Sequence, residues 1–453
     1  MASPVARTGS MSIIQPRTLA GFRDFLPQEM IQRQALMDVA RRVYESFGFS
    51  PIDTPTLELL EILTGKGSEE TDRQMYRFQD HGGRDVGMRF DLTVPLARYV
   101  AQHIGQLGTP FKRYHIAPVW RGERQQRGRY REFVQCDFDT IGTRSVMADI
   151  EMVLVIHQLL GSLGFERFQI RVNNRKLLNG MLASLDLQDR STPILRALDK
   201  LEKDGPEAVA KEMVDQAGVD TNTAQRILEL SQQKGDWESL LGVAKGLVGS
   251  HELGLEGISE LRQVMEAAAA SGVPAERIQL DVSIARGLDY YTGTIVETIL
   301  GDLPSIGSVC SGGRYDNLAG VYTKQDLPGV GASLGLDRLL AAMDELGLVG
   351  EAQTPAQVLL TYFDPELQLY YLQLASQLRE SGLKVEVYPE AAKLKKQLKY
   401  ADQKKIPAVL VIGSQERQDG QVQLKWMVEG NQENIDISGS IDPLVQAIQV
   451  NLS

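Results

Sequence analysis

KRYHIAPVWRGERQQRGRYREFVQCDFDTIG, residues 112–142, places six arginines in a strand, loop, strand pattern. An apolar strand ends at Trp120, and in a second strand the apolar residues 134, 136 and 138 alternate with the polar residues 135, 137 and 139. This alternation predicts a hairpin with one apolar and one polar face. Guanidinium groups are planar, permanently charged donors that suit phosphates and carboxylates, so the hairpin predicts a cradle for a nucleotide or an acidic ligand. A solvated charged hairpin is the alternative that these residues alone leave open.

The composition predicts a folded protein with two or three domains. The chain has 453 residues, of which 43% are hydrophobic and 24% charged, as is typical of globular proteins. No apolar run approaches the roughly 20 residues that cross a bilayer, so we expect no membrane partner. The net charge is -11, which argues against DNA and against indiscriminate nucleic-acid binding. Any RNA surface must therefore be a local patch.

The cysteines and the N-terminal residues indicate the cellular compartment in which the protein works. Cys136 and Cys310 are the only two cysteines; they form neither a disulfide framework nor a cysteine metal site, and they fit the reducing cytoplasm. Residues 1–16 are basic and small but contain no apolar signal core. They exclude a secretory peptide, predict a disordered tail and leave a short organellar leader open.

The N-terminal part predicts helices and strands that need no function to explain them. Residues 31–47 carry the apolar stripe of a long helix, and Pro55 follows in a short edge strand. Strands at 75–78 and 86–90 then lead into a second helix. Asp91 and Thr93 stand just before Pro95, where a helix N-terminus leaves backbone amides free, so capping explains both residues.

The middle of the chain contains a helical insertion and two compact motifs. Residues 147–163 predict a helix, 168–172 a strand, and 176–272 a mostly charged helical insertion without a chemical motif. After a strand at 278–284 come ARGLDYYTGTIVE, residues 285–297, and SGGRYDNL, residues 311–318. On its own Arg286 is a turn residue, whereas Gly312 and Gly313 allow a close backbone approach and Tyr315 offers a hydroxyl.

A third motif, GVGASLGLDRLLAAM, occupies residues 329–343. It predicts a glycine-bearing strand that enters a helix with Arg338 in its first turn. The glycine spacing and the preceding KQDLP do not match a dinucleotide fingerprint. The sequence contains no P-loop, H-E-x-x-H or C-x-x-C motif, so we expect no metal site from a protein motif.

The C-terminal part follows a linker at residues 346–356. Strands at 356–363, 384–389 and 408–413 alternate with helices at 365–382 and 392–405. This alternation predicts a small α/β domain with parallel pairing. The second helix carries a basic rim that includes Lys395, Lys396 and Lys399. From the residues alone, the rim is either a solvated face or an RNA surface.

Several segments together resemble class II aminoacyl-tRNA synthetases. Residues 31–55 match motif 1, the dimer-forming element, 112–142 resemble motif 2, and 329–343 resemble motif 3. RGERQQRGRYREFVQCDFD, residues 121–139, resembles the histidyl-tRNA synthetase version of motif 2. The motifs at 285–297 and 311–318 resemble the two signatures peculiar to these enzymes and their close paralogues. The chain is identified as a member of the histidyl-tRNA synthetase family over nearly its whole length.

The resemblance implies a fold and a reaction. The fold would be an α+β catalytic domain with a mostly antiparallel class II sheet at 17–345, interrupted by the helical insertion, and a C-terminal α/β anticodon-binding domain at 357–453. The protein would form a homodimer. It would use ATP, accompanied by Mg²⁺, to convert L-histidine into histidyl-adenylate and would transfer the histidine to the 3′ end of tRNA(His). In the family, an insertion at this place lies over the acceptor arm of the tRNA.

The resemblance also implies roles for individual residues. Arg121 and Arg286 would be catalytic near the α-phosphate, while ATP would be bound by Arg121, by Glu123 on the adenine side and by Arg338 at the γ-phosphate. The histidine site would contain Asp91, Thr93, Gln135 and Asp139 at the α-amino end, and Tyr291 and Tyr315 at the imidazole, with Tyr290 in the same pocket. Contacts to tRNA would come from Gln126, Lys395, Lys396 and Lys399, and Pro55 would belong to the dimer interface.

Two rival functions belong to related proteins. The regulatory paralogue of histidine biosynthesis keeps the fold, senses histidine and activates ATP phosphoribosyltransferase without catalysis. It typically loses parts of the two histidine signatures and lacks the anticodon domain, both of which occur here. A class II synthetase for proline, threonine or serine would carry zinc ligands or lack ARGLDYY.

Overall fold

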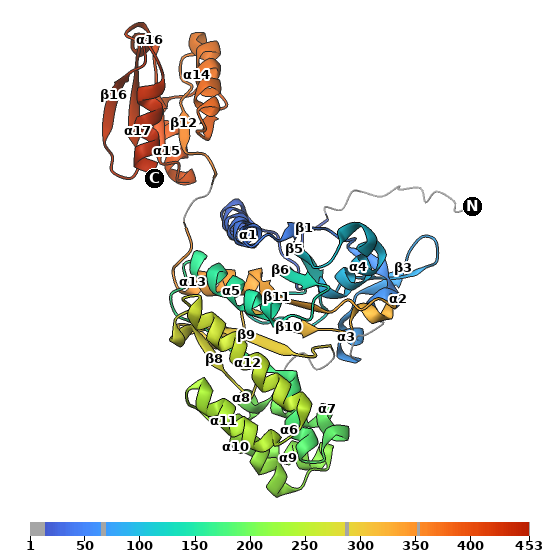
Figure 1. Ribbon diagram of the computed structural model, residues 1–453. Helices are drawn as coiled ribbons and strands as arrows, with labels where there is room; N and C mark the ends of the chain where they lie inside the picture. The colour runs from blue at the N-terminus through green and yellow to red at the C-terminus, as the bar shows by residue number, and fades with distance from the viewer. Residues whose placement is uncertain (1–13, 65–68, 286–289, 351–353, 453) are drawn as a thin grey trace, which may run out of the picture. The chain divides into compact units, whose positions relative to one another are not determined.

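The computed structural model describes residues 14–64, 69–285, 290–350 and 354–452 (Figure 1). Contacts divide the chain into two compact units. The first consists of Leu36–Leu348 with the residues up to Asp24, and the second of Val349–Ser453 with Phe25–Ala35. Among the described residues, no helix is both long and apolar enough to span a membrane.

An eight-stranded sheet organises the first unit, in the order β1-β5-β6-β11-β10-β9-β7-β8. The two edge pairs, β1–β5 and β7–β8, are parallel, and every pair between them is antiparallel. The strands are β1 (Ser50–Pro51), β5 (Phe111–Trp120), β6 (Glu132–Ile141), β11 (Gly329–Gly335), β10 (Cys310–Tyr315), β9 (Thr294–Leu300), β7 (Phe168–Asn174) and β8 (Ile278–Leu280). The mostly antiparallel sheet expected from the sequence is confirmed.

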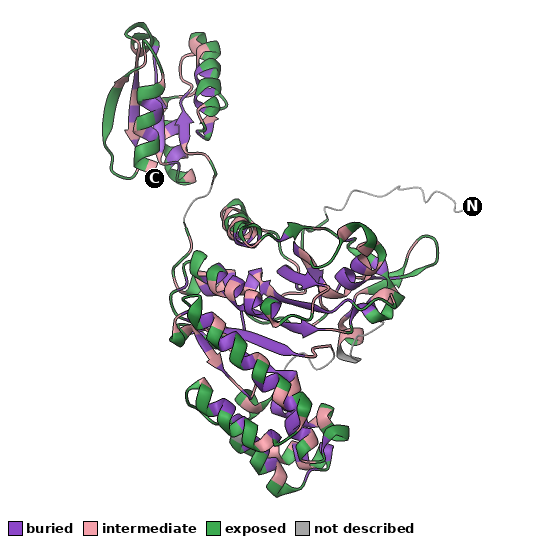
Figure 2. Ribbon diagram, viewed as in Figure 1, coloured by how far each residue is buried: buried purple, intermediate pink, exposed green. Residues whose placement is uncertain are grey.

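Helices bury one face of this sheet, as the purple strands and inward helix faces of Figure 2 show. The largest apolar cluster joins the sheet to α1 (Pro27–Ser46), α5 (Val146–Ser162), α12 (Glu252–Ala270) and α13 (Leu336–Glu345). Tyr44 of α1 is fully buried there and donates to the Cys136 carbonyl over 2.9 Å. The opposite face of the central strands carries their polar side chains.

Smaller elements complete the first unit. A three-stranded sheet, ordered β2-β4-β3, consists of β2 (Leu57–Leu59), β4 (Asp85–Met88) and β3 (Arg77–Gln79), and α4 (Thr93–Leu107) follows it. Between β7 and β8 the chain is helical, and the helices before α12 are α6 (Arg175–Ser184), α7 (Ser191–Leu198), α8 (Leu201–Asp204), α9 (Pro206–Ala217), α10 (Thr221–Ser231) and α11 (Trp237–Val248).

The strand expected at 278–284 is shorter in the structure, where β8 ends at Leu280. The carboxylate of Asp281 accepts hydrogen bonds from the backbone amide of Ser283 at 3.0 Å and from its hydroxyl at 2.6 Å. This local side-chain turn competes with sheet pairing and ends the strand. The apolar alternation in the sequence did not reveal it.

The second unit is a five-stranded sheet in the order β13-β12-β14-β15-β16. Its elements are β12 (Val358–Leu360), α14 (Gln368–Glu380), β13 (Val385–Val387), α15 (Leu394–Lys404), β14 (Ala408–Val411), α16 (Ser414–Gln418), β15 (Gln421–Trp426), β16 (Gln432–Asp436) and α17 (Asp442–Leu452). The first three strands pair in parallel, as expected. The strands β15 and β16, which were not predicted from the sequence, extend this sheet as an antiparallel hairpin joined by a short turn.

Candidate active site

The floor of the site is the polar face of β6 and of the strands beside it. Gln135, Asp137 and Asp139 alternate along β6 and therefore share one face. All three are buried, with exposed fractions of 8%, 2% and 3%. The alternative of a solvated charged hairpin therefore does not hold for this strand. Across the sheet, Asp137 pairs with Ser333 of β11, which pairs with Ser311 of β10.

Glycines in β10 and β11 make room above this floor. A Cβ atom at Gly331 would lie 2.2 Å from Oδ1 of Asp139, and one at Gly329 would lie 2.3 Å from the ring of Tyr315. At Gly313 it would lie 2.5 Å from the carbonyl oxygen of Thr294. Any side chain at these positions would have to displace backbone or site residues, so the depth of the site depends on glycine.

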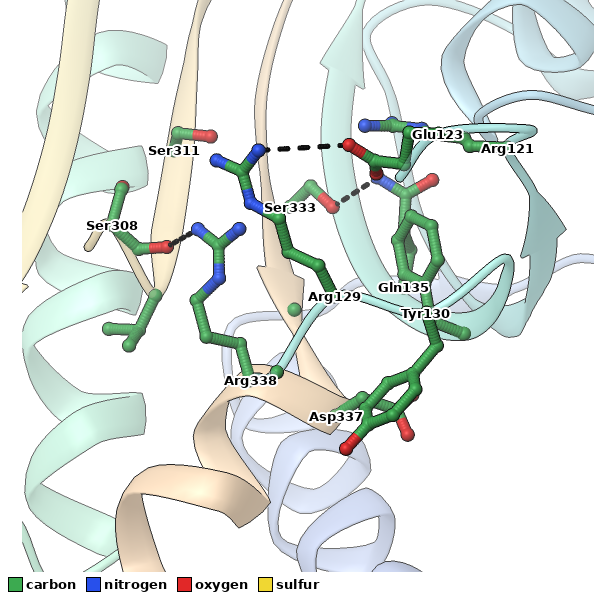
Figure 3. A pocket seen from close by; sticks show the side chains of 14 residues that line it. Arg121, Glu123, Arg129, Tyr130, Gln135, Ser308, Ser311, Ser333, Asp337 and Arg338 are labelled. Carbon is green, nitrogen blue, oxygen red and sulfur yellow. Dashed lines mark hydrogen bonds and ion pairs between the residues drawn. The ribbon is translucent and has the colours of Figure 1, made fainter. Parts of the chain in front are cut away.

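Two pockets adjoin above the floor. The first, drawn in Figure 3, is lined among others by Arg121, Glu123, Arg129, Tyr130, Phe133, Ser308, Asp337 and Arg338. The second is lined among others by Asp91, Thr93, Asp137, Asp139, Tyr290, Tyr291 and Tyr315. Four residues line both pockets and form their common wall: Arg121, Gln135, Ser311 and Ser333. The sequence-predicted ATP residues described here thus collect in the first pocket, and the predicted histidine residues collect in the second.

Arg121 stands in the common wall just after β5. Its Nε donates to the carbonyl of Phe90 over 3.1 Å. Its guanidinium also lies 4.4 Å from the ring centroid of Phe90 and 5.1 Å from that of Phe133. These contacts fix the plane of the guanidinium, while its two Nη groups have no hydrogen-bond partner among the described residues. They remain available to an anion that bridges the two pockets.

Two further guanidinium groups enter the first pocket from different elements, as Figure 3 shows. Arg338, in the first turn of α13, donates through Nη1 to the carbonyl of Ser308. Arg129, in the hairpin loop, lies 3.7 Å from the carboxylate of Glu123. The loop turns tightly there because Gln126 and Arg129 exchange backbone hydrogen bonds of 2.9 and 3.2 Å. Arg129 was not singled out from the sequence, where it was one of several arginines in a loop.

An N-terminal strap, residues 20–23, fastens this pocket from outside. The Gly21 carbonyl accepts from the backbone amide of Arg131 at 3.0 Å. Arg23 forms a 2.5 Å ion pair with Asp337 and lies 3.3 Å from the ring centroid of Tyr130. Because Asp337 and Tyr130 both line the pocket, the strap holds two of its walls. No local pattern in the sequence could reveal a contact between residues 314 positions apart.

Asp91 lines the second pocket and also caps the helix beside it. Its Oδ1 accepts from the backbone amides of Thr93 at 3.0 Å and Val94 at 2.9 Å, which confirms the capping interpretation for Asp91, whereas Thr93 is the first residue of α4. The same side chain also lines the pocket together with Thr93. The capping interpretation and the binding prediction are therefore compatible.

The deep end of the second pocket is aromatic and acidic. Asp139 lies 2.5 Å from Nη2 of Arg113, a fully buried guanidinium, and it accepts from the hydroxyl of Tyr315. Burial and the neighbouring Asp139 raise the pKa of Tyr315 well above its usual value, so this hydroxyl keeps its proton. The Tyr290 ring centroid lies 4.7 Å from that of Tyr291 and 6.2 Å from that of Tyr315.

Asp137 lies between this deep end and the common wall. Its Oδ1 is buried and has no hydrogen-bond partner among the described residues. Burial raises the pKa of this carboxyl to about 7, although the charge of Arg113 acts in the opposite direction. Sequence reasoning placed Asp137 on the polar face but gave it no role, because alternation reveals a face and not the contacts made on it.

The remaining predicted residues that the structure describes lie outside the two pockets. Arg286 falls outside the described residues, as do the first 13 residues of the expected tail. Gln126 is exposed in the hairpin loop, and Pro55 is exposed between β1 and β2. On α15 of the second unit, Lys395, Lys396 and Lys399 are all exposed, and Lys396 forms a 2.5 Å ion pair with Glu390.

Comparison with known proteins gives consistent matches along the chain. The family model for histidyl-tRNA synthetase matches residues 21–339, and the model for an anticodon binding domain matches residues 357–447. The chain is 59% identical over 442 residues to a histidine–tRNA ligase of Rhodopirellula baltica, covering 97% of this chain and 100% of that protein. It is 49% identical over 426 residues to one of Wolinella succinogenes, covering 93% and 96%. A solved histidyl-tRNA synthetase of Nostoc sp. PCC 7120 is 35% identical, with a TM-score of 0.88 over 97% of this chain and 100% of that one.

Proposed function

The chain belongs to the histidyl-tRNA synthetase family, and from this premise we propose how its two pockets divide the reaction. The protein is a class II aminoacyl-tRNA synthetase that uses ATP to charge tRNA with histidine. The regulatory paralogue is not favoured, because relatives 45–59% identical over nearly the full chain are histidine–tRNA ligases. The first pocket takes ATP and the second takes L-histidine.

The common wall carries this proposal. Formation of histidyl-adenylate requires the histidine carboxylate to meet the α-phosphate in line, with added negative charge on phosphorus in the transition state. Arg121 lines both pockets, so its free Nη groups can reach the carboxylate and the α-phosphate together. Electrostatic stabilisation of this kind needs a donor that is already oriented, and the contacts of Arg121 with Phe90 and Phe133 orient it.

The other polar groups of the first pocket bind the remaining parts of the ATP molecule. Glu123 takes the adenine side and Arg338 the γ-phosphate, while Arg129, held near Glu123, adds a third guanidinium to the nucleotide. Mg²⁺ accompanies ATP, because this ion keeps several waters and is usually held by substrate phosphates with one or two carboxylates. Arg286 completes the catalytic set by its position in the ARGLDYYTGTIVE motif.

The second pocket holds the α-amino end of histidine near the common wall and the imidazole at the deep end. Asp91, Thr93 and Gln135 surround the α-amino end, while Tyr290, Tyr291 and Tyr315 surround the imidazole. The resemblance implied that Asp139 holds the α-amino end. We assign it instead to the imidazole end, because it accepts a hydrogen bond from the hydroxyl of Tyr315.

The tRNA, the dimer and the compartment complete the proposal. The exposed lysines of α15 and Gln126 of the hairpin loop contact tRNA(His), the former by positive charge near phosphates. The α6–α12 insertion covers the acceptor arm. Pro55 lies in a homodimer interface beside Leu57 and Leu59, which are 44% and 42% exposed on β2. The enzyme works in the cytoplasm.

One experiment tests the pocket assignment. The protein should exchange pyrophosphate into ATP with histidine and not with proline or threonine. A chain ended at Gly350 should retain this exchange, because the residues of both pockets precede that position, while its charging of tRNA should fall. Exchange with another amino acid, or loss of exchange in a folded truncated chain, would contradict the assignment. A light-scattering mass measurement of the full chain tests the dimer.

A further inference from the structure

The floor of the histidine pocket contains more carboxylates than cations. Asp91, Asp137 and Asp139 all line it, whereas the guanidinium groups described beside them are those of Arg113 beneath the floor and Arg121 in the common wall. His115, which pairs with Asp137 across β5 and β6, does not supply a third cation. Burial and the charges of Arg113 and Arg89 lower the pKa of His115 to about 4, so its imidazole is neutral at pH 7. The described part of the floor is therefore short of positive charge.

Two of these carboxylates already have partners. Asp139 contacts Arg113 with one oxygen and receives the hydroxyl of Tyr315 with the other. Asp91 receives two backbone amides at the start of α4. Asp137 interacts with Ser333, but its Oδ1 has neither a hydrogen-bond nor an ion-pair partner among the described residues, although the side chain is 2% exposed. An open, buried carboxylate oxygen in a pocket is a strong acceptor for a cationic ligand group.

A second open acceptor lies next to Asp137 on the same strand. Gln135 donates through Nε2 to the hydroxyl of Ser333 over 2.8 Å, which leaves its Oε1 without a partner. The two residues are two positions apart and share a face of β6, so their Cα atoms lie about 7 Å apart. Gln135 also stands in the common wall with Arg121, where the substrate carboxylate meets ATP. In an amino acid, the ammonium group is attached to the carbon next to that carboxylate.

We propose that Asp137 binds the α-ammonium of the histidine substrate together with Gln135, while Asp139 positions Tyr315 and Arg113. Histidine then supplies the cation that the floor lacks, and its three N–H donors reach Asp137, Gln135 and the Asp91–Thr93 corner. This inference rests on the proposal that the second pocket takes histidine. It adds a specific carboxylate that neither the motif resemblance nor the pattern of the sequence identified.

Three ligands distinguish a contact with the ammonium group from a contact with the imidazole. L-histidine and histidinol both carry the ammonium group, and 3-(imidazol-4-yl)propionate lacks it but keeps the imidazole and the carboxylate. Titration calorimetry with the full-length protein should show that Asp137→Asn weakens histidine and histidinol by roughly 10- to 100-fold, as expected for loss of a charged hydrogen-bond partner. The affinity for imidazolepropionate should change less than about twofold, within the additivity expected for a remote contact.

Asp139→Asn is the matched control, because it removes a charge from the same strand face two positions away. It should weaken all three ligands alike through Tyr315 and Arg113. Equal losses for all three ligands in Asp137→Asn would place Asp137 at the imidazole, and unchanged histidine binding would leave it without a substrate contact; either result overturns the proposal. Asp137→Ser provides the same comparison if the Asn variant does not fold. Failure of the unmodified protein to bind histidine would instead overturn the function of the pocket.

Discussion

Replacing Asp137 with Asn should stabilise the folded protein at alkaline pH, although we expect it to impair substrate binding. Burial raises the pKa of Asp137 from 3.8 to about 7. The folded state then binds this proton more tightly than the unfolded state, so the contribution of Asp137 to stability is fully present below pH ~4 and is lost as the pH rises through ~7. The difference between a pKa of 3.8 and one of about 7 sets a ceiling of about 4 kcal/mol on the loss. Asn keeps the shape of the side chain and carries no charge, so it avoids this loss.

Denaturant unfolding of the full-length protein and of the variant, at pH 5 and pH 8.5 without ligand, measures this effect. At pH 5 the variant should already be more stable by up to about 1.6 kcal/mol, because the loss begins once the pH exceeds the usual pKa of 3.8. At pH 8.5 the variant should be more stable in the transition of the first unit, by up to about 4 kcal/mol. Asp326→Asn is the control, since Asp326 is 65% exposed and pairs with Arg144, and should show no such pH dependence. Equal stabilities at both pH values, or a less stable variant at pH 8.5, would mean that Arg113 already compensates an ionised Asp137 and would refute the reasoning.

Four other substitutions test separate parts of the site. Arg121→Ala should slow adenylate formation in single-turnover kinetics by roughly 10² to 10³, the scale of one lost preorganised donor, and a normal rate would remove Arg121 from the reaction. Arg23→Ala should raise the KM for ATP several-fold and leave the KM for histidine unchanged, because the strap holds Asp337 and Tyr130; an unchanged KM for ATP would contradict this. Gly331→Ala should abolish histidine binding measured by calorimetry, because its Cβ would meet Asp139 at 2.2 Å, and normal binding would show that the strand can shift. Joint replacement of Lys395, Lys396 and Lys399 by Glu should weaken tRNA binding in filter assays, with a loss that shrinks as salt rises; a salt-independent loss would point to misfolding of α15.

The sequence predicted the fold class and many of the residues that line the two pockets, because both depend on compact motifs. The alternation in β6 and the glycines of β10 and β11 are visible in the sequence, and they shape the floor of the site. The residues that were missed act through contacts that no local pattern records. Arg113 reads as one polar residue in a strand, yet it is the buried partner of Asp139. Arg23 meets Asp337 only after the whole catalytic unit has folded.

The second unit shows the opposite case, in which a local signal was present and was not used. In β15 the buried residues Val422, Leu424 and Trp426 alternate with polar residues, which is the pattern of a half-buried strand. The expectation of parallel pairing came from the preceding strands and helices. That expectation says nothing about a hairpin, because the short turn between Trp426 and Gln432 makes the two strands antiparallel.

In the proposed assignment, the four residues that line both pockets couple the binding of ATP to the binding of histidine. If bound ATP changes the affinity for histidine by some factor, bound histidine must change the affinity for ATP by the same factor. This holds because the two binding free energies form a closed thermodynamic cycle. Gln135 and Ser333 are joined by a hydrogen bond, so a ligand that reorients one of them alters what the other presents to the neighbouring pocket. In the proposed assignment, the wall thus allows each substrate to prepare the site for its partner.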